Sequence, residues 1–376
     1  MSGAVLPPDA FVVSLARLPQ IGPARLRALV ADADPRHVWE QLCIGRVPAE
    51  VLDRVPQHQR PTLIESWRRA ALGLDPATYW RAHADAGVGV TVLGSPSFPE
   101  VFAADDDPPV VLFWKGDLDH LAGVRAAIVG TRRASRYGCD VAFALGRDLA
   151  VAGVAVVSGL ALGIDGAAHS GAIEAAGAPP IAVVGSGLDR VYPRAHGALW
   201  RRVIDAGVII SEYPLGAPAA AWQFPARNRL IATLADALIV VESQHTGGAM
   251  GTAVEAARRD RVVLAVPGPV TSPGSDGTNQ LLVDGCVPAR DASDVLVALG
   301  RQSVPRRRSA ETRLAPSAEA SAVLDQVPWQ AAPIEQVLLA TSQDLGALAV
   351  MLDELEVKGW IAQRAGWVER LGRADS

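Results

Sequence analysis

Short apolar runs alternate with alanine-rich segments through the middle of the chain, from about residue 123 to residue 300. Each run is continuous and is bounded by glycine, serine or proline. Continuous apolar runs separated by helical segments are typical of parallel strands that are buried on both faces. The runs cover residues 126–129, 154–157, 181–184, 208–210, 237–241 and 262–266. This pattern predicts an α/β fold with a doubly wound, mostly parallel sheet.

The region before this sheet has a different pattern. Prolines divide the first 75 residues into short segments, in which apolar residues recur at helical spacing. Two further strands are predicted at residues 88–93 and 110–114. We therefore expect a small helical domain over residues 1–75 and the α/β domain over residues 76–300.

The region after the sheet begins with a linker pattern. Residues 301–316 contain five arginines, one glutamate and two prolines. Leucines then recur at helical spacing, and apolar pairs at 360–361 and 367–368 flank a turn at Ala365-Gly366. Helices followed by a hairpin predict a winged-helix-like domain over residues 317–376.

The composition favours a protein with sizeable cores, because 49% of the residues are apolar and 20% are charged. The formal net charge of -5 does not indicate a nucleic-acid binder. No apolar run approaches the roughly 20 residues of a membrane span, and no signal peptide is recognisable, so we expect a cytoplasmic protein with no membrane partner. Cys43, Cys139 and Cys286 lack metal-binding spacing, so we expect reduced thiols and no metal site.

The loops that follow the predicted strands are the candidate site, since ligands of a doubly wound sheet lie at the carboxyl ends of its strands. Nearly all of these loops contain glycine, a hydroxyl residue or both. Glycine lets backbone amides approach a ligand, and helix N-termini favour anions. The hydroxyl groups of Thr131, Ser158 and Thr246 are candidate donors to phosphate oxygens.

Common nucleotide motifs are absent from the sequence. Residues 130–138 read GTRRASRYG, which differs from the dinucleotide fingerprint G-x-G-x-x-G, and no acidic residue follows at the required distance. The sequence also lacks G-x-x-x-x-G-K-[ST]. We therefore expect no nucleotide cofactor and no phosphate-loop hydrolase.

Two further groups of polar residues are conspicuous. Arg227, Asn228 and Arg229 lie at a predicted helix start, where multi-donor side chains suit an anion. A solvated helix end with ordinary surface arginines is the alternative. Asp165 and His169 share a helix face and could serve acid–base chemistry or half a metal site. A buried structural pair is favoured, because no third ligand or nucleophile stands at suitable spacing.

Seven short motifs follow one another along the chain. They are V-G-T-R at 129–132, S-G-L-A-L-G-I-D-G-A-A-H at 158–169, G-L-D-R-V-Y-P at 187–193, S-E-Y-P at 211–214, F-P-A-R-N-R at 224–229, P-G at 267–268 and G-T-N at 277–279. In this order they resemble the DNA-processing protein A family (DprA, also called Smf). The flanking regions agree with a sterile-alpha-motif-like (SAM-like) N-terminal domain and a C-terminal winged helix, and the resemblance implies a Rossmann-like central fold.

The resemblance implies binding without catalysis. Family members bind and protect single-stranded DNA and load the RecA recombinase in natural transformation and homologous recombination. The implied partners are single-stranded DNA, RecA, a second copy of the chain and a single-strand-binding protein, and no cofactor is implied. The residues that correspond to the family's phosphate pocket are Arg132, Ser158, Gly159, Arg227, Asn228, Arg229, Thr246, Gly247 and Gly248.

The sequence departs from the family pattern at several positions. Many members have arginine where this chain has Leu162, so one phosphate contact is missing or comes from Arg133 or Arg136. The later glycine loop, residues 246–253, also differs. Gln20 replaces the first glycine of a helix-hairpin-helix turn, so we expect the N-terminal domain to have a structural or protein-binding role.

The distribution of charge limits how the domains could bind DNA. Residues 121–300 contain fifteen arginines and fifteen acidic residues. DNA binding there requires arginines gathered at one sheet edge. The predicted helix at 342–358 carries four acidic residues against Lys358, which does not suit a major-groove reader. We expect a protein-interaction or modulatory module, and a solvated charged face is the alternative.

An enzyme is the alternative function. Residues 247–255 resemble, with one extra residue, the G-G-x-G-T-x-x-E motif of lysine-decarboxylase-like nucleoside-monophosphate phosphoribohydrolases. The extra residue turns Glu255 by about 100° around a helix. A third reading is a scaffold that acts only through its terminal domains. We expect a single-stranded DNA-binding protein that is not an enzyme.

Overall fold

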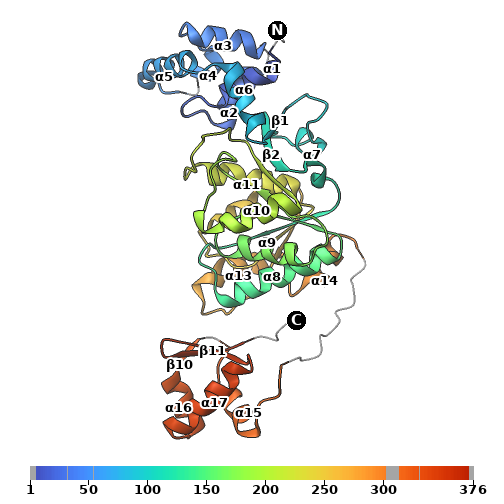
Figure 1. Cartoon of the computed structure of the whole chain (residues 1–376), viewed down its shortest axis with the longest axis vertical. Coiled ribbons are helices and arrows are strands. Elements are labelled where there is room, and N and C mark those ends of the chain that lie inside the picture. The colour runs from blue at the N-terminus through green and yellow to red at the C-terminus, as the bar shows by residue number, and fades with distance from the viewer. Residues whose placement is uncertain (1–5, 32, 54, 302–312, 330, 372–376) are drawn as a thin grey trace. The chain divides into compact units, whose positions relative to one another are not determined.

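The chain divides into two compact units in the computed structural model. The first unit is Met1–Val304 and the second is Pro305–Ser376 (Figure 1). The structure describes residues 6–31, 33–53, 55–301, 313–329 and 331–371. Most of the predicted linker, residues 302–312, lies outside the described residues.

A nine-stranded sheet forms the centre of the described first unit. Its strands are β1 (Gly89–Val92), β2 (Val111–Gly116), β3 (Arg125–Val129), β4 (Ala155–Ser158), β5 (Ile181–Val183), β6 (Val208–Ser211), β7 (Ala237–Val240), β8 (Val262–Ala265) and β9 (Val287–Pro288). Their order across the sheet is β1-β2-β6-β5-β4-β3-β7-β8-β9. Neighbours from β6 to β9 pair in parallel, whereas β1 and β2 pair antiparallel at one edge. The predicted doubly wound, mostly parallel sheet is confirmed.

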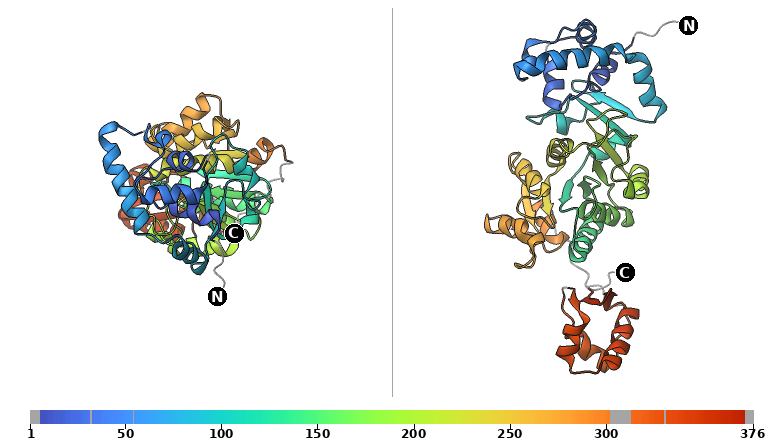
Figure 2. Two further views of the ribbon diagram at one scale, coloured as in Figure 1. Left: turned by 90° about the horizontal axis from the view of Figure 1, so that it is seen from above. Right: turned by 90° about the vertical axis from the view of Figure 1, so that its left-hand side faces the viewer.

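Helices cover both faces of this sheet (Figure 2). They are α7 (Glu100–Ala103), α8 (Arg136–Val151), α9 (Ile164–Glu174), α10 (Gly197–Ala206), α11 (Gln223–Leu234), α12 (Gly248–Ala257), α13 (Asp276–Val283) and α14 (Ala292–Ala298). In β3, Ala126 and Ile128 pack in the core under α8, α9 and α14, whereas Ala127 and Val129 pack under α11 and α12. Strand side chains alternate between the faces, so burial on both faces requires the continuous apolar runs in the sequence.

Short helices precede the sheet. They are α1 (Pro8–Leu15), α2 (Pro23–Val30), α3 (Pro35–Cys43), α4 (Ala49–Leu52), α5 (Arg60–Leu72) and α6 (Pro76–Asp85). Proline stands in the first turn of most of them, where its missing N–H breaks no helical hydrogen bond. Asp34 and Asp75 cap two of the helices by accepting backbone hydrogen bonds. Prolines thus start these helices and also keep them short.

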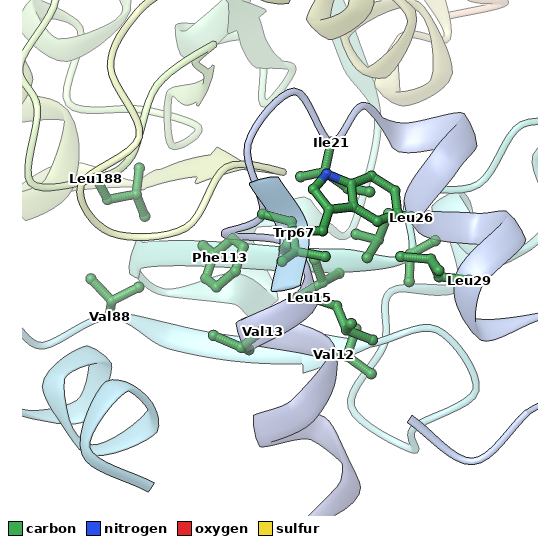
Figure 3. Close-up of a cluster of buried hydrophobic side chains, with 14 of the residues drawn as sticks. Val12, Val13, Leu15, Ile21, Leu26, Leu29, Trp67, Val88, Phe113 and Leu188 are labelled. Atoms are coloured by element: carbon green, nitrogen blue, oxygen red, sulfur yellow. The ribbon is translucent and has the colours of Figure 1, made fainter. Parts of the chain in front are cut away.

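These helices share a hydrophobic core with one edge of the sheet. Leu15, Leu29 and Trp67 belong to the same cluster as Phe113 of β2 and Leu188 of the loop after β5 (Figure 3). The N-terminal helices are therefore packed against the α/β part of the first unit. The domain boundary expected near residue 75 stays a prediction.

The turn between α1 and α2 keeps a left-handed residue although its glycine is replaced. Gln20 has a φ of 57°, a conformation that glycine adopts at lower cost. The indole Nε1 of Trp67 donates a hydrogen bond of 2.8 Å to the Pro19 carbonyl, which holds the turn against α5. The backbone shape of the hairpin therefore does not depend on the missing glycine.

The second unit has its own core, which includes Val323, Leu348 and Leu355. Its elements are α15 (Ala318–Leu324), β10 (Ala332–Pro333), α16 (Ile334–Thr341), α17 (Leu345–Val357), β11 (Ile361–Arg364) and β12 (Trp367–Arg370). β11 and β12 form the expected hairpin around Ala365 and Gly366, and β10 pairs with β12. The winged-helix assignment stays a prediction. Across the described residues of both units, no helix is long and apolar enough to cross a membrane.

We expect the first unit to fold without the second, because each has a separate hydrophobic core. A chain ending at Val304 should unfold cooperatively, with its melting temperature within a few degrees of the matching transition in the full chain. Differential scanning calorimetry of both proteins measures this. A truncated chain that aggregates or melts without cooperativity would show that the units depend on each other.

Candidate functional site

A small cleft opens at the carboxyl ends of β3, β4 and β5, where the start of α11 meets the loops of the sheet. Its volume is about 40 Å³, far below the roughly 300–1,000 Å³ of common small-molecule pockets. The cleft suits one compact group rather than a nucleotide cofactor. The residues that line it are Arg132, Gly159, Ala161, Leu162, Val184, Gly185, Ser186, Tyr192, Pro193, Phe224 and Arg227.

The loop after β3 is anchored so that Arg132 reaches the cleft. The Thr131 amide donates to the Glu242 carbonyl at 2.7 Å. The buried Glu242 carboxylate accepts hydrogen bonds from the amide and hydroxyl of Ser135, at 2.8 and 2.7 Å. The guanidinium of Arg132 lies over the Phe224 ring, 4.5 Å from its centroid. This cation–π contact holds a positive charge at the mouth of the cleft.

Arg227 forms the floor of the cleft and is only 5% exposed. Its Nη1 donates to the Val183 carbonyl at 2.5 Å, whereas its buried Nε has no hydrogen-bond partner among the described residues. A Cβ atom at Gly159 would lie 1.8 Å from Nη1. Only glycine at position 159 therefore leaves room for this guanidinium.

The charge of Arg227 is offset in part by Asp165 at the start of α9. Burial lowers the pKa of Arg227 to about 10, the Asp165 charge raises it, and the nearby Arg132 charge lowers it. Burial also raises the pKa of Asp165, and Arg227 acts in the opposite direction. Arg227 remains charged at neutral pH, so the cleft presents two positive groups above one buried carboxylate.

The loop after β4 has a strained shape that two side chains stabilise. Leu160 is buried and has a left-handed φ of 53°, which costs a residue with a side chain roughly 1 kcal/mol or more. The Asp165 carboxylate accepts the Gly159 amide at 3.1 Å, and His196 Nδ1 lies 3.0 Å from the Leu160 carbonyl. The Gly159 amide thus points to Asp165 rather than offering itself to a ligand.

Three of the predicted site residues have structural partners instead. The Ser158 hydroxyl is fully buried and donates to the Ile128 carbonyl at 2.6 Å. Asn228 Nδ2 donates to the Gly248 carbonyl at 3.3 Å. Arg229 is buried and lies outside the described lining of the cleft. The structure therefore brings Arg132, Gly159 and Arg227 together and directs these three side chains elsewhere.

Arg229 belongs to an ion-pair network in which Arg229 and Glu212 are buried and the other members are partly exposed. Its Nη2 lies 2.5 Å from Glu212 Oε1, and its Nε lies 3.2 Å from Asp107 Oδ2. Asp107 also pairs with Arg27 of α2 at 2.5 Å. The network links α11, the β2 side of the sheet and the N-terminal helices. Its loss would leave Glu212 buried without a counter-charge, which is strongly destabilising.

The later glycine loop lies away from this cleft. Thr246 and Gly248 are exposed, and Gly247 is the N-cap of α12. Within the described part of the chain, none of these three residues lines the cleft. The loop is joined to α11, the helix that carries Arg227, by the hydrogen bond from Asn228 to the Gly248 carbonyl.

The two arginines considered as substitutes for the missing arginine of the S-G-L-A motif also lie outside the described lining of the cleft. Arg133 is exposed, and Arg136 lies 3.7 Å from Asp140 on its own helix. Leu162 itself lines the cleft and is 42% exposed. At this position the chain presents an apolar side chain rather than a charge.

Asp165 and His169 are both buried, and they serve different parts of the structure. The Asp165 carboxylate holds the loop after β4 by accepting the Gly159 amide. His169 lies on α9, and its side chain is fully buried. Among the described residues, no group of three or more His, Cys, Asp or Glu side chains could hold a metal ion. Both side chains are buried, but none of the described hydrogen bonds joins them, so they do not form the structural pair that the sequence favours.

Glu255, the residue on which the enzyme alternative depends, is engaged within its own helical segment. It accepts hydrogen bonds from Arg258 at 3.0 Å and from Arg259 at 2.6 Å. It is not among the described residues that line the cleft. In the described part of the chain, this carboxylate is directed at Arg258 and Arg259 rather than into the cleft.

Residue-level reasoning missed the aromatic part of the cleft. Tyr192 and Phe224 lie in motifs that the sequence analysis recognised, yet neither was assigned to the site. Their rings are 5.4 Å apart, and both line the cleft. The available signal was their place in the G-L-D-R-V-Y-P and F-P-A-R-N-R motifs, which follow strands of the parallel sheet.

A family model described as DNA recombination-mediator protein A matches residues 89–300. This match spans more than half of the chain, so the chain belongs to that family. The family that the motifs resemble is thereby confirmed. Protein Smf of Escherichia coli (strain K12) is 35% identical over 285 residues, which are 74% of this chain and 76% of that protein.

Two solved structures of DNA processing protein A are similar to this chain. The X-ray structure from Streptococcus pneumoniae has a TM-score of 0.61 and 26% identity, and the match covers 78% of this chain and 98% of that one. A structure that describes the single-stranded DNA binding mode of the Helicobacter pylori protein has a TM-score of 0.51 and 30% identity. That match covers 56% of this chain and 95% of that one.

We predict that His169 makes the protein sensitive to acid. Burial lowers its pKa to about 4, against a smaller opposing effect of the Ser158 backbone. Its ordinary value is 6.5, so between pH 6.5 and about 4 the unfolded chain binds a proton that the folded chain does not. The free energy of unfolding should fall by up to roughly 3 kcal/mol as pH decreases through this window.

Urea unfolding of the wild type and His169→Leu across this pH range measures the effect. The variant should lose less stability on acidification, whatever its stability at neutral pH. Identical pH dependence in the two proteins would contradict the prediction.

Proposed function

We propose that the chain binds single-stranded DNA by holding a backbone phosphate in the cleft between Arg132 and Arg227. The observation that carries this proposal is the pair of guanidinium groups at the carboxyl edge of a parallel sheet. One of them, Arg227, is buried, and its Nε has no partner among the described residues. That Nε is closed to solvent, so an anion in the cleft would be held by Arg132 and by the part of the Arg227 guanidinium that lines the cleft.

The size and charge of the cleft fit a phosphate group. Its volume of about 40 Å³ accommodates a compact anion and excludes a whole nucleotide. Arginine donates planar, paired hydrogen bonds that match phosphate oxygens. Since the surrounding residues 121–300 contain equal numbers of arginines and acidic residues, local placement of the arginines is what favours an anion here.

Family membership supports DNA as the source of that phosphate. The chain belongs to the DNA recombination-mediator protein A family, and the similar Helicobacter pylori structure concerns the single-stranded DNA binding mode of that protein. We therefore propose a role in DNA processing during natural transformation or homologous recombination. The family resemblance supports the further steps of protecting the strand and loading RecA, as well as a homodimer and contact with a single-strand-binding protein.

We further propose that the protein is a binding module rather than an enzyme. Asp165 is committed to the Gly159 amide, and Glu255 is committed to Arg258 and Arg259. Neither carboxylate is paired with a nucleophile in the described site. The chemistry that the cleft supports is electrostatic capture of an anion.

Arg132→Ala tests the phosphate contact. The variant should bind single strands roughly tenfold or more weakly at low salt, as expected when a charged hydrogen bond of about 1.5–3 kcal/mol is lost. The slope of log affinity against log salt should flatten by about 0.7, the value for one contact on a single strand. Fluorescence anisotropy with labelled oligonucleotides across a salt series measures both quantities.

Arg133→Ala is the matched control, because Arg133 is an exposed neighbour outside the cleft. It should change the slope less than Arg132→Ala does, and thermal melts should show that both variants are folded. Equal slopes for the wild type and Arg132→Ala would mean that the strand binds elsewhere.

Nucleoside monophosphates should not be hydrolysed. Incubation with AMP should release no adenine detectable by chromatography, because Glu255 is paired with arginines of its own segment. Release of free base that disappears in Glu255→Ala would instead support the phosphoribohydrolase alternative.

A further inference from the structure

The second unit keeps an unusual share of apolar surface in solvent. It holds 58 of the 352 described residues but seven of the 21 large apolar side chains that are exposed. Single exposed apolar residues are common and need no explanation. A concentration on one helix does need one, and Leu345, Val350 and Val357 all belong to α17 (Figure 1).

The solvent side of α17 lacks the polar surface that such a helix usually has. Leu348, Leu352 and Leu355 face the core of the second unit. At about 3.6 residues per turn, the exposed positions form one continuous face on the other side of the helix. The side chains on this face are those of Leu345, Ala349, Val350, Asp353, Glu356 and Val357. Four of these six are apolar, whereas a surface helix normally turns charged or polar residues to water.

The charges on this face of α17 are all negative. Asp353 and Glu356 are exposed, and Glu356 accepts hydrogen bonds from the amide and the side chain of Gln363, at 2.9 and 3.0 Å. Lys358 follows the helix but is engaged with Glu354 at 2.8 Å. No lysine or arginine of α17 itself neutralises the two exposed carboxylates. The face therefore combines apolar side chains with an uncompensated negative charge.

We propose that this face binds a helix of another protein that carries apolar side chains along one side and lysine or arginine beside them. Val350 and Val357 are seven residues apart, two turns along the same side, which is the spacing at which one helix contacts another. Opposite charges across an interface favour association and select the partner, so Asp353 and Glu356 select a basic helix. This inference goes beyond the proposed DNA binding and does not depend on it.

The same charges disfavour the other occupants of such a face. Asp353 and Glu356 repel the phosphates of a nucleic acid. They also repel an anionic membrane surface, which carries the same sign of charge. A second copy of α17 would bring like charges together, with no positive side chain on the face to pair with them. A basic protein helix is the occupant that matches both the apolar and the charged side chains.

The experiment measures binding of the full chain to three labelled peptides of roughly 20 residues, long enough to form a helix. The first peptide has leucines along one side and lysines beside them, and the second has glutamates in place of the lysines. The third is a shuffled form of the first, in which the leucines no longer share a side. Fluorescence anisotropy should show that the wild type binds the lysine peptide roughly tenfold or more tightly than the other two, a difference of at least about 1.4 kcal/mol.

Val350→Ser should weaken binding of the lysine peptide roughly tenfold, as expected when the burial of one valine side chain is lost. Val297→Ser is the matched control, because Val297 is 64% exposed on α14 of the first unit. It should leave the affinity unchanged.

Asp353→Asn should weaken binding of the same peptide and flatten its dependence on salt, because one charge pair across the interface is lost. Glu174→Gln is the matched control, since Glu174 is an exposed carboxylate at the end of α9. It should change neither quantity. Thermal melts should show that all four variants are folded.

Three results would overturn the docking face on α17. The wild type could bind the lysine peptide no more tightly than the glutamate or shuffled peptide, Val350→Ser could bind it as tightly as the wild type, or Val297→Ser could weaken binding as much as Val350→Ser. Self-association of the full chain that Val350→Ser removes and Val297→Ser keeps, measured by sedimentation, would also overturn it, because a second copy would then occupy the face.

Discussion

The buried guanidinium of Arg227 is the constraint around which the cleft is built. A charge removed from water must be neutralised and hydrogen-bonded, and Asp165 and the Val183 carbonyl do this only in part. The guanidinium also needs space, which requires glycine at position 159. Asp165 in turn fixes the loop that contains the left-handed Leu160. The remaining donor capacity of Arg227 is what makes the cleft suitable for an anion.

The sheet could be predicted from the sequence because its cause is local and repeated. Continuous apolar runs such as residues 126–129 have no polar face and are short, which is typical of strands buried on both sides. The antiparallel edge of the sheet was harder to predict, because the pairing of β2 with β6 joins residues that are far apart in the sequence. The same holds for the contact of Trp67 with the cluster around Phe113. No periodicity within a short segment reports which distant surface that segment covers.

The candidate site could be predicted only in part, and helix geometry explains why the structure separates two of the predicted residues. Arg227 and Arg229 stand two residues apart, and such positions do not face each other on a helix. Arg227 therefore reaches the cleft, while Arg229 meets Glu212 and Asp107 on another side. The sequence motifs identify both arginines, but the carboxylates that pair with Arg229 come from distant segments. The inward direction of the Ser158 hydroxyl was hidden for the same reason.

The central claim is that a DNA phosphate lies between Arg132 and Arg227. A crystal structure of the chain with a short oligothymidylate tests this most directly. The account predicts a backbone phosphate within hydrogen-bond distance of both guanidinium groups. A strand that is well ordered elsewhere on the protein, with this cleft empty or filled by solvent, would contradict the account.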